Sequence, residues 1–330
     1  MRRTSALVSS VALVTVLSAA LVGCAASPDD VTACTPALAS GNASSLVTAT
    51  GEVGSAPKVE VPAPLVSPQP QRSVLEEGKG LVARKGMTVD FDAAIYDGAT
   101  GTQLLETKFD GTQGVRFRAG LKTSAQQKEV GSLATSLVCA QPGQRIALTT
   151  TALDSGLDLS SVGISDDDHT IVVVIDVQEV FPGKADGLNQ LPQDGMPVVV
   201  TAPDGTVGIT VPSGIKVPSK DRTATIKLGS GARLAKGDLA VLQVASWSWP
   251  TGDDATISQK SSTWDVGGTP STLVLTDEGD QAVPAVLLDA LVGTPVGSQV
   301  ITVIAPKGDS TEATVYVIDV LGIQTFPATK

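Results

Sequence analysis

The residues best suited to chemistry form one short run, in which three consecutive aspartates precede the only histidine of the chain. These are Asp166, Asp167, Asp168 and His169. Carboxylates and imidazoles are common metal ligands. However, neighbouring residues rarely converge on one ion, and no second group of His or Cys supports the run. The pattern favours a solvated loop, and we expect neither a metal site nor a cofactor.

Other motifs that carry chemistry are missing from the sequence. It contains no GxSxG or HExxH motif, and no GKS/T or GxGxxG opens a helix. The net charge is −11, and no run of Lys and Arg is interleaved with aromatic residues. Nucleic-acid binding needs cations that neutralise phosphates, so we exclude it. The acidity more simply serves solubility.

The first 24 residues have the pattern of an export signal. Arg2 and Arg3 precede an apolar run and then small residues, as in secretory signal peptides. The run ends in Leu21–Cys24, which resembles the lipobox of bacterial lipoproteins and implies lipidation of Cys24. Two acyl chains, at about 0.8 kcal/mol per buried CH₂, anchor a protein stably. We expect an extracytoplasmic protein, lipid-anchored to the outer face of the cell membrane; a secreted protein with a chance cysteine is the alternative.

Two further cysteines, Cys34 and Cys139, lie downstream of the signal. Thiols outside the cell membrane tend to be oxidised, so we predict a disulfide between them. It would tie the N-terminal tail to the first domain and contribute roughly 4–5 kcal/mol in the chain-entropy model. Two free buried thiols are the alternative.

The elements that would position a site are mainly strands. The chain has 330 residues, which suggests about two domains at ~100–200 residues each. Hydrophobic residues make up 42%, enough for a core in each domain. Val and Thr are abundant and favour strands, whereas long helical periodicity is nearly absent. The sequence therefore predicts a β-rich globular protein.

An internal repeat organises the chain, because three sequence anchors recur in the same order in its two halves. The spacing of the anchors implies that the second copy lacks about 11 residues between its last two strands. The matched stretches are 76–93 with 227–245, 141–150 with 295–304, and 173–177 with 316–320.

Each copy predicts the same series of elements. A strand is followed by a short amphipathic helix with apolar residues at helical spacing, and then by two more strands. One helix packed on an antiparallel sheet is an α+β layer. The predicted fold class is thus α+β, with two domains that are each a twisted antiparallel sheet packed on one short helix. The expected stretches are 57–65 and 206–212 for leading strands, 88–95 and 239–246 for central strands, and 127–138 and 282–293 for helices.

The order of motifs resembles that of FKBP-type peptidyl-prolyl isomerases. The first copy carries GKG, KGMTVDF, DGATG, VRFRAG, PGQRIAL and IDV, and the second carries VGSQVITVIAP and YVIDVL. The layout is similar to actinobacterial lipoproteins with two degenerate FKBP-like domains, and the resemblance covers roughly residues 57–323. It implies an apolar pocket that favours a twisted X–Pro amide over the more polar planar one. Such a reaction needs no acid, base, nucleophile or metal.

The resemblance also implies which residues would line the pocket of the first domain. Small aliphatic side chains stand at most of the family's aromatic positions, and Leu105 falls where the family has an Asp. Gly156 lies near the position of a late-loop Tyr. The predicted pocket is therefore apolar and small-walled. Its residues are Phe91, Leu104, Val115, Val130, Leu133 and Ile175.

The second domain departs further from the family pattern. Val244, Leu287 and Ile318 stand at aromatic positions, and the loop over the pocket is shortened, so we expect no turnover there. Trp247 and Trp249 alternate on a strand and share the face opposite Val244. We expect them to pack against the other domain or the leading strand; an exposed partner-binding patch is the alternative.

The predicted function is a weak, membrane-anchored peptidyl-prolyl isomerase that assists the folding of exported proteins through its first domain. Its partners would be X–Pro segments of exported polypeptides, and we expect a monomer. The alternative is a non-catalytic binding or scaffold lipoprotein that kept the fold. The predicted boundaries are 1–23 for the signal peptide, 24–56 for the tether and tail, 57–180 for the first domain, 181–197 for a linker and 198–324 for the second domain.

Overall fold

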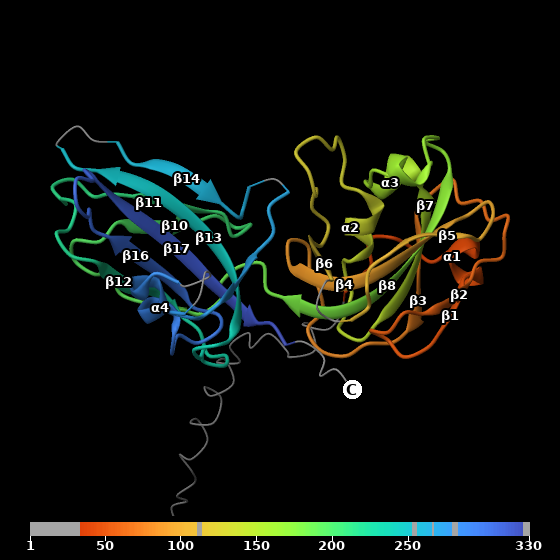
Figure 1. Cartoon of the computed structure of the whole chain (residues 1–330), viewed down its shortest axis with the longest axis horizontal. Coiled ribbons are helices and arrows are strands. Elements are labelled where there is room, and N and C mark those ends of the chain that lie inside the picture. Colours follow the sequence, from red (N-terminus) through yellow and green to blue (C-terminus); the bar gives the residue numbers. More distant parts are fainter. Residues whose placement is uncertain (1–33, 111–113, 253–255, 266, 279–282, 326–330) are drawn as a thin grey trace, which may run out of the picture. The chain divides into compact units, whose positions relative to one another are not determined.

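The computed structural model describes residues 34–110, 114–252, 256–265, 267–278 and 283–325 (Figure 1). The predicted signal peptide, Cys24 and most of the predicted tether lie outside these residues. All described residues from Thr35 onward belong to one compact unit of the chain. Cys34 and Cys139 are both disulfide-bonded, which confirms the predicted bridge. Among the described helices, none has the length and apolar character needed to cross a membrane.

The first domain is built on a six-stranded antiparallel sheet with the order β3-β7-β8-β4-β5, in which β6 also pairs with β4. Runs of Val, Ile and Ala make β7 and β8 and most of β4 buried, because β-branched side chains pack well on a pleated surface. The strands are β3 (Gln71–Glu76), β4 (Thr88–Asp97), β5 (Gln103–Glu106), β6 (Val115–Arg118), β7 (Arg145–Thr151) and β8 (Thr170–Phe181).

The second domain has a seven-stranded antiparallel sheet with the order β14-β13-β17-β16-β12-β9, in which β15 also pairs with β13. Its long central strands are the counterparts of β4 and β8. The strands are β9 (Leu188–Asn189), β12 (Arg222–Leu228), β13 (Leu239–Pro250), β14 (Ser258–Ser262), β15 (Ser271–Val274), β16 (Gln299–Ile304) and β17 (Glu312–Ile323).

The short helix predicted for each copy packs on its main sheet, as α2 in the first domain and α4 in the second. In the first domain the further short helices α1 and α3 also contact the sheet. A separate two-stranded hairpin accompanies each sheet, β1–β2 in the first domain and β10–β11 in the second. The predicted α+β class with two tandem domains is confirmed. The remaining elements are α1 (Asn42–Leu46), β1 (Thr48–Thr50), β2 (Lys58–Glu60), α2 (Ser132–Ser136), α3 (Ala152–Ser155), a 3₁₀ helix (Ser160–Val162), β10 (Val198–Thr201), β11 (Val207–Thr210) and α4 (Ala285–Leu291).

Both main sheets bury apolar side chains on their two faces. In the first domain the larger cluster lies on the helix side and includes Phe91 and Leu137, while Tyr96 and Leu65 belong to the cluster on the opposite face. In the second domain the larger cluster lies on the hairpin side. It holds all three tryptophans of the chain, Trp247, Trp249 and Trp264.

The sequence repeat reappears in the backbone pairing. A register shift interrupts β4 between Asp90 and Phe91, and another interrupts β13 at the equivalent pair, Val241 and Leu242. Cys139 takes a left-handed φ of 67°, and the residue matched to it in the second copy is a glycine, Gly293, with φ of 83°. The two domains therefore share irregular details as well as strand order.

The predicted leading strands form outside the main sheets. Residues 57–65 contain β2, which pairs with β1, and residues 206–212 contain β11, which pairs with β10. The strands that precede the central strands in the main sheets are instead β3 and β12, which pair with β7 and β16. The predicted boundaries remain predictions, although β1 lies in the predicted tail and β9 in the predicted linker.

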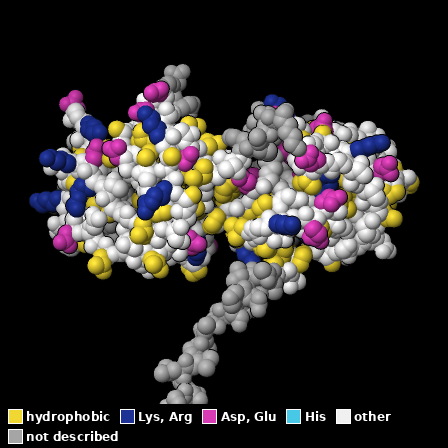
Figure 2. All heavy atoms as spheres, turned by 90° about the horizontal axis from the view of Figure 1, so that it is seen from below, with side chains coloured by type: hydrophobic (Ala, Val, Ile, Leu, Met, Phe, Trp, Pro, Cys, Tyr) yellow, Lys and Arg dark blue, Asp and Glu magenta, His cyan; other side chains and the backbone are white. Residues whose placement is uncertain are grey.

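Charged side chains are dispersed over the face seen in Figure 2, where Lys and Arg are interspersed with Asp and Glu. One ion pair lies in the interior. Arg145 on β7 places Nη2 2.6 Å from Oδ2 of Asp176 on β8, and both side chains are fully buried. The same guanidinium donates to the carbonyl oxygens of Gly51 and Glu52, so it ties the segment between β1 and β2 to the sheet.

Candidate functional site

A cavity of about 490 Å³ opens in the first domain between residues 126–131 and the helix α3. This volume is within the range of small-ligand pockets. The wall of the cavity formed by α3 belongs to the connection between β7 and β8. A short connection would leave the cavity without this wall. The lining residues are Gln126, Gln127, Lys128, Glu129, Val130, Gly131, Leu153, Asp154 and Gly156.

Two glycines let the walls of this cavity meet. A Cβ added at Gly131 would lie 2.5 Å from the carbonyl oxygen of Ser155, and Gly156 has a left-handed φ of 76°. Gln127 closes the contact, because its Nε2 donates to the carbonyl oxygen of Gly156 at 2.8 Å and to Oγ1 of Thr123 at 3.0 Å. The residues before α2 are thereby held against the loop between β7 and β8, residues 152–169, which we call the late loop.

The helix α3 is held in place by hydrogen bonds at both ends. The hydroxyl of Thr151 accepts from the backbone N–H of Asp154 at 3.1 Å, as an N-cap residue does. Ser155 Oγ donates to the carbonyl oxygen of Ala152 at 2.6 Å. Leu153 is therefore presented from a fixed turn, and its side chain is 65% exposed.

The cavity combines apolar and charged side chains. Val130 is half-buried and Leu153 is exposed, whereas Lys128, Glu129 and Asp154 face solvent. None of the lining residues is a Ser, Cys or His that could act as a nucleophile or base. The arrangement can accept an apolar side chain while the flanking main chain of the ligand stays hydrated.

Only Val130 of the six predicted pocket residues lines this cavity. The other five belong to, or pack against, the core on the helix side of the sheet, and as ligand-binding residues all six remain predictions. Phe91, Leu133 and Ile175 are buried in that core, and Leu104 and Val115 are half-buried against it.

Sequence reasoning missed a second aromatic residue beside Phe91. The ring of Phe117 meets that of Phe91 edge to face, with centroids 5.5 Å apart and an interplanar angle of 83°. Phe117 lies on β6, two residues after Val115, so both side chains point to the same face of the strand. The signal was present in the motif VRFRAG, where Val115 and Phe117 alternate with arginines.

The second domain has no counterpart of the late loop. Residues 305–311 join β16 to β17, whereas residues 152–169 join β7 to β8, so the connection in the second domain is the shorter one. Ile318 is buried in the helix-side core of the second domain, and Val244 and Leu287 pack against that core.

Trp247 and Trp249 lie on the hairpin side of the second sheet. Each is only 4% exposed, so the alternative of an exposed tryptophan patch is wrong. They pack with Val207 and Ile209 of β11, which lies in the predicted leading strand. The expected packing of the two tryptophans against the leading strand is therefore confirmed. Aromatic side chains alternating on one strand can be covered by a hairpin as well as by a partner.

His169 pairs with a carboxylate within its own domain. Its Nε2 lies 2.8 Å from Oδ1 of Asp97 at the end of β4. The pKa of Asp97 is lowered: burial opposes this shift, but hydrogen bonds from the Ala99 N–H, His169 and Thr100 outweigh it. Within the described ranges, no group of three or more His, Cys, Asp and Glu side chains could hold a metal ion.

No protein-family model matches the chain, and no curated protein sequence matches it. Several solved structures are similar to it. The three FKBP domains of wheat FKBP73 align with 77% of this chain and 94% of that chain at 14% identity, with a TM-score of 0.31. The N-terminal domain of FKBP42 from Arabidopsis thaliana aligns with 39% of this chain and 98% of that chain at 16% identity and a TM-score of 0.29. FkpA from Escherichia coli aligns with 34% of this chain and 49% of that chain at 18% identity and a TM-score of 0.26. Scores this low identify neither an activity nor a ligand.

Proposed function

We propose that the first domain binds X–Pro segments of exported polypeptides at the cavity between residues 126–131 and α3, and slowly isomerises their prolyl bonds. The observation that carries this proposal is the cavity itself. It places Val130, which the family resemblance marks as a pocket residue, opposite the exposed Leu153 on a fixed turn. An X–Pro segment has an apolar ring, which matches the apolar side chains of the cavity, and a hydrated main chain, which matches its solvent-facing charged side chains.

Prolyl isomerisation needs no proton transfer from the site. Rotation about an ordinary peptide bond has a barrier of ~18–20 kcal/mol, and uncatalysed X–Pro bonds interconvert over tens to hundreds of seconds. A surface that prefers the twisted, less polar amide accelerates the rotation without proton transfer. The lining set, which has no Ser, Cys or His, is compatible with this reaction.

We also propose that the protein works outside the cell membrane, held there by a lipid on Cys24. The disulfide-bonded Cys34 and Cys139 support an oxidising location. The lipid anchor itself rests on the resemblance of Leu21–Cys24 to a lipobox. Mass spectrometry of the membrane-extracted protein tests it, since an unmodified thiol at Cys24 would contradict the anchor.

A second candidate function is binding of X–Pro segments without isomerisation. One observation favours it: Phe91, Leu133 and Ile175, which the resemblance places around a substrate, are sealed in the core with exposures of 1%, 3% and 0%. A pocket whose floor is closed offers less surface to a twisted amide. Binding and catalysis are therefore measured separately.

Binding is tested by titrating a short Ala–X–Pro–Phe peptide into the mature chain (residues 24–330) carrying Cys24→Ser, which prevents acylation. Leu153→Asp should weaken binding at least tenfold, because it sets a carboxylate where an apolar group would dock. Leu188→Asp is the matched control, since Leu188 is 80% exposed and lies on β9 of the second domain. Equal affinity of both variants would place the peptide elsewhere.

A further inference from the structure

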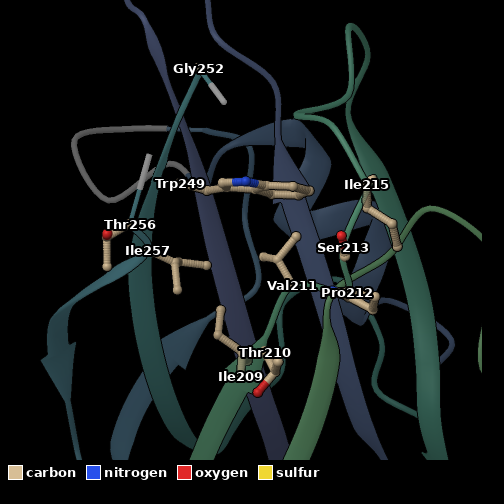
Figure 3. Close-up of a pocket in the computed structure, with 11 residues that line it drawn as sticks. Ile209, Thr210, Val211, Pro212, Ser213, Ile215, Trp249, Gly252, Thr256 and Ile257 are labelled. Carbon is tan, nitrogen blue, oxygen red and sulfur yellow. The ribbon is translucent and has the colours of Figure 1, made fainter. Parts of the chain in front are cut away.

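The second domain has a hollow of its own, on the hairpin side of its sheet and away from α4. Its volume is about 560 Å³, and an adjoining hollow of about 410 Å³ shares Gly214, Ile215, Trp249 and Gly252 with it. Figure 3 shows the indole ring of Trp249 between Ile257 on one side and Ile215 on the other, with Val211 below. The hollow thus separates the end of β13 from residues 211–217, which follow β11.

Strand pairing identifies the same place in the first domain. Asp176 of β8 faces Asp92, and its repeat partner Asp319 of β17 faces Gln243. Counting along β4 and β13 from that pair makes Gly98 the equivalent of Trp249. The segments that follow β2 and β11 also match, with Val-Pro at 61–62 and at 211–212. Each domain therefore has an equivalent strap, residues 61–67 and residues 211–217.

In the first domain this strap lies directly on the sheet. The N–H of Leu65 donates to the carbonyl oxygen of Gly98 at 2.7 Å, and the N–H of Ser67 donates to Thr170 Oγ1 at 3.0 Å. Leu65 is buried in the core on that face. A Cβ at Gly98 would lie 2.9 Å from the carbonyl oxygen of Leu65, so no larger residue fits there while the strap is in place.

In the second domain a tryptophan stands at the glycine position, and the strap packs apolar side chains against the core of that face without bonding its backbone to the sheet. Within the described residues, the only backbone hydrogen bond of residues 211–217 is local, from the N–H of Ile215 to the carbonyl oxygen of Pro212 at 3.2 Å. The space that the first domain fills with its own strap is thus open in the second.

We propose that the hollow beside Trp249 binds an extended polypeptide segment in which proline neighbours aliphatic residues. In the first domain, the equivalent position on the sheet is covered by a segment of this type, because Val-Pro-Ala-Pro-Leu, residues 61–65, lies on it. Proline-rich segments dock on aromatic-lined grooves in other recognition modules, since they lose little conformational entropy on binding.

The hollow has the side chains for this ligand. Ile209, Val211, Ile215 and Ile257 are half-buried and give apolar contacts, while Trp249, only 4% exposed, borders the hollow from the buried core. Lysine and arginine are absent from the lining of the larger hollow, which argues against an anionic ligand. This site lies in the other domain from the proposed isomerase cavity and goes beyond that proposal.

Tryptophan fluorescence tests the proposal, because all three tryptophans belong to the core around this hollow. The probe is the peptide Val-Pro-Ala-Pro-Leu-Val-Ser, added to the mature chain with Cys24→Ser; the matched peptide has both prolines replaced by alanine. We expect a saturable change with the first peptide and at least tenfold weaker binding of the second. Ile215→Asp should abolish the change. If Ile215→Asp unfolds the domain, Ser213→Trp, which adds a bulky side chain at an exposed position of the hollow, should abolish binding measured by isothermal titration calorimetry, because its added tryptophan alters the fluorescence itself.

The variant Leu153→Asp separates this site from the cavity of the first domain. We expect it to leave the fluorescence titration unchanged. Loss of binding in Leu153→Asp would assign the peptide to the first domain and overturn the inference. So would a flat titration, equal binding of the two peptides, or binding that survives both Ile215→Asp and Ser213→Trp.

Discussion

Replacing one aspartate in each domain by asparagine should have opposite effects on stability. Asp176 and Asp319 are equivalent residues on β8 and β17, and each faces a residue of the neighbouring strand. That residue is Arg145 in the first domain and Gln299 in the second. Both aspartates are fully buried, but only Asp176 has a cationic partner in contact, so the same substitution removes an ion pair in one domain and an isolated carboxyl in the other.

In the first domain, Asp176→Asn leaves the guanidinium of Arg145 buried without a counter-charge. Both of its hydrogen bonds to Asp176 are 2.6 Å long, and the Arg145 side chain has no exposure. Breaking a buried pair on one side costs about 3–5 kcal/mol. With an m value of about 2 kcal/mol per molar urea, the midpoint of the first domain should fall by roughly 2 M.

In the second domain, burial raises the pKa of Asp319, although the N–H of Ala185, the amide of Gln299 and nearby lysines partly oppose the shift. A raised pKa means that the folded state holds a proton that the unfolded state has released. The contribution of Asp319 to stability is therefore greatest below the unfolded pKa and falls as pH rises through the folded one. Asp319→Asn should remove this pH dependence and leave stability at pH 7 equal or about 1 kcal/mol higher, because the new amide can donate to the buried, unpaired Oε1 of Gln299.

The two domains can be observed separately in one denaturation. All three tryptophans lie in the second domain, so fluorescence reports its unfolding, while far-ultraviolet circular dichroism reports both domains. Asp176→Asn should shift the dichroism transition and spare the fluorescence transition. Equal destabilisation of the fluorescence transition by Asp319→Asn, or a steeper pH dependence in that variant, would refute the reasoning.

Three further predictions concern the first domain. Gly131→Ala should destabilise it and weaken X–Pro binding, because the added Cβ meets the carbonyl oxygen of Ser155 at 2.5 Å. Gly208→Ala on β11 is the control in thermal melts and peptide titrations, because nothing lies within 4 Å of the added Cβ and the residue has no left-handed φ. Reducing the disulfide of Cys139 should cost about 2–5 kcal/mol in the dichroism transition of the first domain, and no change would show that the bridge is structurally idle. Phe91→Ala should cost about 3–5 kcal/mol, since its ring is buried against Phe117; a small cost measured in urea would mean that the ring faces a pocket instead of the core.

The central strands could be predicted because their residue types strongly favour buried β-strands. β4, β8, β13 and β17 are long apolar runs, and the repeated IDV motif fixed how the two copies correspond. The strands that precede the central strands in the main sheets, β3 and β12, could not be recognised, since charged and hydroxyl residues interrupt their alternation. The stretches taken for them are more apolar and form the hairpins that cover the opposite face.

The cavity of the first domain depends on contacts that sequence patterns do not show. The predicted helix over residues 127–138 is confined to Ser132–Ser136, because Gly131 has an extended backbone and Gln127 bonds to Gly156. This long-range contact, 29 residues apart in sequence, decides that residues 126–131 form a wall. The difference between the two straps likewise follows from packing against Gly98 or Trp249.

The central claim is that the first domain accelerates prolyl isomerisation, and the exchange rate of an Ala–X–Pro–Phe peptide tests it most directly. Two-dimensional NMR exchange spectra would be recorded with the peptide alone, with the mature chain carrying Cys24→Ser, and with the same chain also carrying Leu153→Asp. We predict faster cis–trans exchange with the chain and a return to the uncatalysed rate with Leu153→Asp. An unchanged rate in the presence of the folded chain would contradict the claim and leave binding without catalysis.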